Sequence, residues 1–88
     1  MHEMSLMNSL VSQVNQIASR EGANRVLAVK VRLGALSHMS PEHFREHFNL
    51  ATQGGIAGEA RLDIETSDNQ NDADAAGIII DTVEIEKD

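Results

Sequence analysis

Apolar residues recur every three or four positions near the start of the chain, at Met7, Leu10, Val11, Val14, Ile17 and Ala18. This spacing places them on one face of a helix. Gly22 follows the run, and glycine commonly ends helices because it adopts the left-handed backbone conformation without strain. The pattern therefore predicts a first helix from about Met4 to Arg20.

The next apolar run, RVLAVKVRLG, alternates instead. One face carries Leu27, Val29, Val31 and Leu33, and the other carries Lys30 and Arg32. A two-residue period is typical of a strand with one buried face. We therefore predict a half-buried strand that ends at Gly34.

The stretch SHMSPEHF has the features of a helix start. Ser40 can cap the helix, and Pro41 suits the first helical position. Met39 and Phe44 are spaced as a hydrophobic staple. The predicted helix buries one apolar stripe, made of Phe44, Phe48 and Ala51. It is expected to end at Gly54 and Gly55.

Two further alternating runs, EARLDIET and GIIIDTVEIE, predict a second and a third strand. The first of these runs places Ala60, Leu62 and Ile64 on the buried face. The apolar phase of the second slips by one residue at Asp81–Thr82, which indicates a β-bulge. Residues 67–76, SDNQNDADAA, contain no large apolar side chain and are predicted to form a polar connecting loop.

The element order is helix–strand–helix–strand–strand, which predicts an α+β fold of two layers. A three-stranded sheet would carry both helices on one face, because each amphipathic helix must bury its apolar stripe. The last two strands are joined by a single loop, so we expect them to pair antiparallel. With 88 residues, the chain is expected to form one domain, residues 1–88.

Charge is distributed unevenly along the chain. Residues 59–88 hold ten of the 14 acidic residues and two of the seven basic residues. A solvated acidic surface is the simplest explanation, and nucleic-acid binding is not expected because it requires a basic face. The chain lacks an apolar run long enough to span a membrane and lacks a signal peptide, so we expect a cytoplasmic protein.

The first three residues, Met1, His2 and Glu3, can form a metal site. The amine of Met1, the backbone nitrogen of His2 and its imidazole can close fused chelate rings on one ion, and the backbone nitrogen of Glu3 can complete a plane of four nitrogens. Such a plane favours Ni(II) or Cu(II). On this spacing alone, an ordinary frayed terminus remains the alternative.

His43 and His47 lie one helical turn apart in HFREH. They could share a metal ion, although both could equally be polar residues beside the apolar stripe. The same letters match the H-x-x-E-H pattern of a protease family, but 88 residues do not provide the third ligand and the substrate cleft that a protease needs.

The polar loop places Asp72, Asp74 and Gly77 at positions 1, 3 and 6 of an EF-hand pattern. Position 12 would be Val83 instead of glutamate, so calcium binding there is not expected. A weaker carboxylate site could still use Asp68 with the two loop aspartates. We find no phosphate-binding glycine loop and no paired acid and base, so the chain is not expected to be an enzyme.

Several stretches together are similar to one family. MHEMSL, VLAVKVRLGALS, ARLDIE and VEIE resemble the HypA/HybF family of nickel-insertion accessory proteins for [NiFe] hydrogenase maturation, some of which also serve urease. The resemblance implies two helices against a three-stranded sheet and a nickel site at Met1, His2 and Glu3. It also implies nickel(II) as cargo. The implied partners are an accessory GTPase and the hydrogenase large subunit or the urease apparatus.

The chain departs from that family in one respect. Family members carry a zinc module with two C-x-x-C motifs between the second and third strands, whereas this chain has no cysteine and only the loop 67–76 at that place. No zinc site is therefore expected. Two hypotheses follow: a nickel metallochaperone, or a diverged, metal-independent adaptor that keeps the fold and docks a partner.

Overall fold

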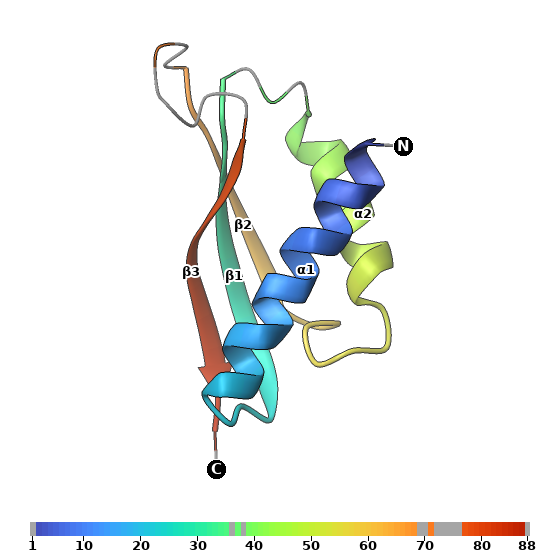
Figure 1. The fold of residues 1–88 in the computed structure, drawn as a ribbon, viewed down its shortest axis with the longest axis vertical. Coiled ribbons are helices and arrows are strands. Elements are labelled where there is room, and N and C mark those ends of the chain that lie inside the picture. The colour runs from blue at the N-terminus through green and yellow to red at the C-terminus, as the bar shows by residue number, and fades with distance from the viewer. Residues whose placement is uncertain (1, 36, 38, 69–70, 72–76, 88) are drawn as a thin grey trace.

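The helices and strands follow one another in the predicted order (Figure 1). The computed structural model describes residues 2–35, 37, 39–68, 71 and 77–87, with side chains from residue 5 onward. The elements are α1 (His2–Arg20), β1 (Arg25–Leu33), α2 (Pro41–Thr52), β2 (Arg61–Thr66) and β3 (Ile78–Glu86). Each lies within two residues of its predicted limits, which confirms the predicted α+β class.

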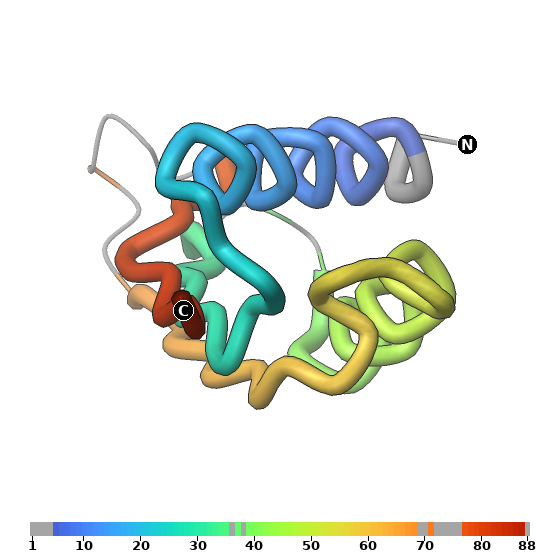
Figure 2. Tube along the Cα trace, turned by 90° about the horizontal axis from the view of Figure 1, so that it is seen from below, coloured from blue at the N-terminus to red at the C-terminus, as the bar shows by residue number. Residues whose placement is uncertain are grey.

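The helices form one layer and the sheet forms the other. Both helices cover the same face of the sheet, α1 on the β3 side and α2 on the β2 side (Figure 2). The largest side chains less than 2% exposed lie between these layers: Phe44, Phe48, Met7, Leu33, Val14, Val29 and Val31. The predicted apolar faces of both helices therefore supply the core.

The end of α1 is closed by backbone hydrogen bonds around Gly22, whose φ is +69°. The Gly22 N–H donates to the Ser19 carbonyl at 3.1 Å, and the Ala23 N–H donates to the Ala18 carbonyl at 2.9 Å. This pair of bonds is the Schellman arrangement, which satisfies carbonyls that the last helical turn leaves unpaired.

The start of α2 also agrees with the sequence. The Ser40 side-chain oxygen accepts a hydrogen bond of 3.2 Å from the His43 N–H, and Pro41 occupies the first helical turn. Met39 and Phe44 are both buried, as a hydrophobic staple requires. The rings of Phe44 and Phe48 stack with centroids 6.3 Å apart, and the side of α2 that carries them packs against the core.

The strand order corrects one prediction. The sheet runs β2-β1-β3, so β2 and β3 do not pair with each other. β1 lies between them, parallel to β2 and antiparallel to β3. The connection between β2 and β3 is long enough to pass the end of the central strand, which a short hairpin turn could not do.

Charge explains why the central position of β1 is favourable. Direct pairing of β2 and β3 would bring the carboxylates of one strand close to those of the other, which is unfavourable across strands. With β1 between them, Lys30 Nζ lies 3.5 Å from Glu65 Oε2 on β2, and Arg25 Nε lies 3.2 Å from Glu86 Oε1 on β3. The basic strand thus separates two acidic ones.

Two irregularities interrupt the pairing of β1 with β3. The register shifts between Lys30 and Val31, where Asp81 has no partner, which confirms the predicted bulge. A second shift between Val26 and Ala28 leaves Leu27 unpaired. The prediction that Leu27 joins the buried face is therefore wrong: Val26 is 2% exposed, whereas Leu27 is 40% exposed.

A membrane-spanning helix was not expected. Over the described ranges, neither α1 nor α2 combines the length and the apolar character needed to cross a bilayer.

Candidate metal centre

The predicted nickel ligands stand at the beginning of α1. Met1 lies outside the described residues, and His2 and Glu3 are described only as helical backbone. The first turns of α1 beyond these residues lie beside α2 in both views (Figures 1 and 2). The backbone of His2 and Glu3 therefore forms the first turn of α1.

The backbone of this helix end suits coordination by amide nitrogens. The first four N–H groups of an α-helix have no carbonyl partner within the helix. Because α1 begins at His2, the amides of His2 and Glu3 are among these groups. A metal ion that displaces their protons would break no helical hydrogen bond. The positive end of the helix dipole opposes a cation, and the negative charge of deprotonated amides offsets that opposition.

The second predicted metal site lies on α2. The rings of His43 and His47 have centroids 6.4 Å apart and are tilted by 42°. His43 is exposed and His47 is half-buried. Two imidazoles fall short of the four ligands typical of a structural zinc site. The pair therefore supports at most a weak site, and the alternative of polar residues beside the buried stripe stays open.

The acidic loop contributes little to a metal site. Asp72 and Asp74 lie outside the described residues, and Asp68 is an exposed residue after β2. Gly77, whose carbonyl accepts a 2.9 Å hydrogen bond from the Gly34 N–H, leads directly into β3. An EF-hand requires a helix after its loop, so the strand rules out that reading.

Other acidic residues are engaged with basic neighbours on the face of the sheet away from the helices. Arg61 Nε lies 3.1 Å from Asp63 Oδ2, and Arg61 Nη2 lies 3.8 Å from Glu84 Oε2. Arg61 and Glu84 flank Ala28 on β1, which is only 4% exposed. Within the described part of the chain, His, Asp and Glu side chains form no group of three or more that could hold a metal ion.

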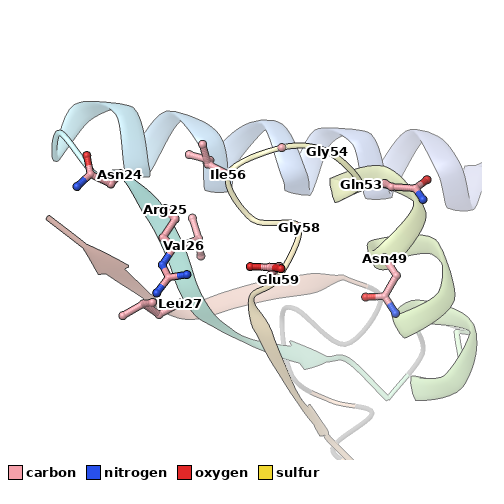
Figure 3. Close-up of a pocket in the computed structure, with 11 residues that line it drawn as sticks. Asn24, Arg25, Val26, Leu27, Asn49, Gln53, Gly54, Ile56, Gly58 and Glu59 are labelled. Carbon is pink, nitrogen blue, oxygen red and sulfur yellow. The ribbon is translucent and has the colours of Figure 1, made fainter.

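A groove of about 820 Å³ lies between the start of β1 and the turn after α2 (Figure 3). It is lined by Asn24–Leu27, Asn49, Gln53–Ile56, Gly58 and Glu59. Its walls contain no histidine and one carboxylate, so it offers neither a metal site nor a catalytic pair. No sequence pattern predicted it, because its two walls come from segments far apart in the chain.

The backbone shapes this groove. The Val26 N–H donates a 2.9 Å hydrogen bond to the Ile56 carbonyl, which ties the turn to the part of β1 that lies before its pairing with β2. Gly54 turns the chain with a φ of +81°. A Cβ at Gly58 would lie 3.1 Å from the Thr52 carbonyl oxygen, so the turn is also tightly packed.

Residues 1–83 match the family model described as hydrogenase/urease nickel incorporation, metallochaperone, hypA. The chain is 45% identical over 65 residues to the hydrogenase maturation factor HypA of Methylocella silvestris, an alignment that covers 74% of this chain and 58% of the relative. It is 39% identical over 70 residues to that of Chlorobium luteolum, covering 80% and 60%. The chain thus spans about three fifths of the length of these relatives.

Two solved structures share the fold. The solution structure of the Ni metallochaperone HypA from Helicobacter pylori aligns with a TM-score of 0.82 and 18% identity over 98% of both chains. A solution structure of a HypA protein aligns with a TM-score of 0.75 and 20% identity, over 100% of this chain and 98% of the other. At such identities the likeness establishes the fold alone.

Proposed function

Because this chain belongs to the HypA family of hydrogenase/urease nickel-incorporation metallochaperones, we propose that it binds nickel(II) at its N-terminus and delivers the ion during hydrogenase maturation. Family membership also agrees with the expectation that the chain is not an enzyme, since a metallochaperone carries an ion and catalyses no reaction. The observation that carries the proposal is the family match beginning at residue 1, together with a helix that begins at His2.

The proposed ligands are the amine of Met1, the imidazole and backbone nitrogen of His2, and the backbone nitrogen of Glu3. Glu3 could alternatively support the site through its carboxylate. Four nitrogens in a plane suit Ni(II), which accepts square-planar geometry. The unpaired amides at the start of α1 support this ligand set, because the helix keeps all its hydrogen bonds when they coordinate.

Delivery requires other proteins. The proposed partners are an accessory GTPase and the hydrogenase large subunit, or the urease apparatus. We further propose that residues 1–88 act as one nickel-binding domain in which the loop 67–76 takes the place of a zinc module. No zinc is expected there, because the chain has no cysteine to supply thiolate ligands.

The short length and the lack of cysteine favour a second candidate function. A diverged relative without the zinc module could keep the fold and dock a partner without carrying metal. The two functions differ in one measurable property, which is nickel binding that depends on a free amine at Met1.

The decisive experiment titrates nickel into three forms of the chain: one with Met1 as the free terminus, one with the Met1 amine acetylated, and His2→Ala. We expect tight binding by the first form alone, with the yellow, diamagnetic signature of square-planar Ni(II). Acetylation removes the amine from the chelate and His2→Ala removes the imidazole. Each change should weaken binding by at least about tenfold, because each removes one ligand.

A His43→Ala, His47→Ala double variant is the matched control, because it removes two imidazoles without touching the terminus. It should bind nickel as the parent chain does. Equal affinity in the parent and the acetylated form would reject the N-terminal site and leave the adaptor function as the better explanation.

A further inference from the structure

The two outer edges of the sheet differ in how well they are protected. β2 is six residues long and alternates charged with apolar residues, whereas β3 is nine residues long and begins with three isoleucines. Proteins usually shield an edge strand by keeping it short or by placing charges on it, since unpaired N–H and C=O groups invite another strand. By these criteria, the first half of β3, Ile78–Ile80, is the unprotected edge.

A groove runs beside this edge, between α1 and β3. We call it the α1–β3 groove; its lining is Leu6, Ser9, Leu10, Gln13 and Ile17 from α1 and Ile78–Val83 from β3. Its larger part has a volume of about 470 Å³. Leu6 is 51% exposed at one end, and Ile78 and Ile80 are only half-buried against the core. Apolar surface is therefore available next to unpaired backbone groups.

The helical wall of this groove is uncharged. The segment Ser5–Ser19 contains no Asp, Glu, Lys or Arg, and its exposed positions are mostly serine, asparagine and glutamine. The centres of protein interfaces are depleted in charged residues, because a buried charge loses its water. Although 24% of all residues in the chain are charged, a partner that covers this helix face would not have to remove water from any charged side chain.

The face of β3 turned away from the helices carries Ile79 in its first half and the carboxylates of Glu84 and Glu86 in its second half. Glu84 and Glu86 have arginine partners on the inner side of the strand, Arg61 at 3.8 Å and Arg25 at 3.2 Å. Asp81 is exposed and, among the described residues, forms no ion pair. A strand added outside β3 would therefore meet apolar residues on the helix side, the exposed Asp81 at the bulge, and the carboxylates of Glu84 and Glu86 on the open side of the second half.

We propose that the outer edge of β3 binds an extended segment of a partner protein in which apolar and basic residues alternate. Main-chain hydrogen bonds to β3 would hold the segment, its apolar side chains would enter the α1–β3 groove, and its basic side chains would face Asp81 and Glu84. β1 has this alternation from Val29 to Leu33 and already pairs with the inner edge of β3. A second copy of β3 in parallel register is a poor occupant, because it would place acidic residues against their own copies. An antiparallel copy would instead appear as a dimer in the test below.

The test uses the full chain and a blocked eight-residue peptide of alternating valine and lysine. Amide shifts and hydrogen exchange in the nuclear magnetic resonance spectrum report the binding site. We expect changes centred on Ile78–Glu86 and on the α1–β3 groove, with slower exchange of the outer β3 amides. The same peptide with an N-methylated backbone, and a valine–glutamate peptide, should bind at least about tenfold more weakly.

Asp81→Lys and Asp68→Lys form a matched pair, since both residues are exposed and both changes alter the net charge equally. Asp81→Lys should weaken binding of the valine–lysine peptide about fivefold, whereas Asp68→Lys should leave it within about twofold. Equal losses in the two variants, equal binding of the N-methylated peptide, or a sedimenting dimer that protects β3 without any peptide would each overturn the proposal. None of these readouts involves nickel, so the result is independent of the proposed function.

Discussion

The turn after α2 contains a glycine in the left-handed backbone conformation, which residues with a side chain rarely adopt. Gly54 has a φ of +81°, and an added Cβ would have no neighbour within 4 Å. Any penalty for a substitution there must come from the backbone alone. Gly55 is not among the left-handed glycines, and an added Cβ there would lie 3.4 Å from the Thr52 carbonyl oxygen.

We predict that Gly54→Ala lowers the free energy of unfolding by about 1–2 kcal/mol, the cost of a left-handed conformation for an L-residue. Gly55→Ala is the control and should change it by less than about 0.5 kcal/mol. Urea denaturation followed by circular dichroism measures both. The strain argument fails if the two variants are equally stable.

The nickel ligands at the terminus lead to a prediction about pH. The imidazole of His2 and the amine of Met1 have reference pKa values of about 6.5 and 7.7–8.0, and both must lose a proton to coordinate. Nickel affinity should therefore rise by at least about 100-fold between pH 6 and 8, with proton release on binding. Calorimetry in buffers of different ionisation enthalpy measures both quantities.

A carboxylate site built from Asp68, Asp72 and Asp74 would behave differently. Its ligands are already ionised above about pH 5, so its affinity would stay flat over this range. It would also prefer calcium or magnesium, which are hard ions that take oxygen ligands. Flat nickel affinity without proton release would point to the loop and away from the terminus.

Among the elements, β3 carries a bulge where it has a single partner strand, whereas residues 28–33 of β1 pair with a strand on each side. Asp81 is an extra residue between two β3 positions whose partners, Lys30 and Val31, are adjacent on β1. The bulge reverses the alternation, so Ile80 and Val83 both pack against the core although they are three residues apart. β1 lies between two partners, and a change of its register would disturb both.

We predict that deletion of Asp81 is tolerated, because it removes the bulge and leaves every apolar residue of β3 on its present face. The free energy of unfolding should change by less than about 1 kcal/mol. Deletion of Lys30 from β1 is the control and should cost several kcal/mol, because a one-residue slip moves buried residues to the open face. Equal losses in the two deletions would contradict the assignment of Asp81 as the extra residue.

The whole molecule is elongated, with extents of 42 × 23 × 17 Å. α1, α2 and β1 contribute most of its buried side chains, while β3 packs against them with half-buried ones. The proposed nickel ligands are consecutive residues at one end, so the same local chelate can form in the unfolded chain. A ligand that binds folded and unfolded chains equally does not stabilise the fold.

We therefore predict that neither chelator nor nickel changes the melting temperature by more than about 2 °C, since 1 kcal/mol corresponds to about 4–8 °C in a domain of this size. Thermal unfolding by circular dichroism, with and without chelator and with saturating nickel, is the measurement. A fall with chelator would reveal a structural metal, and a rise with nickel would show a ligand from elsewhere in the fold, His43 and His47 first.

Local patterns determined much of this protein. Ser40, Pro41 and the stripe of Phe44 and Phe48 sufficed to predict α2, because capping and helical period act within a few residues. The phase slip at Asp81 predicted the bulge for the same reason. The run Met1–His2–Glu3 suggested a chelate from consecutive residues alone, and that site stays a prediction.

Tertiary structure decided the rest. The central place of β1 and the exposure of Leu27 depend on which strands meet, and alternation along one strand does not specify its neighbours. The α1–β3 groove and the groove beside Gly54 exist only where distant segments pack side by side. Strand order depends on how three strands pack together, and the burial of single residues depends on the bulges that their pairing creates, so both are properties of the assembled sheet.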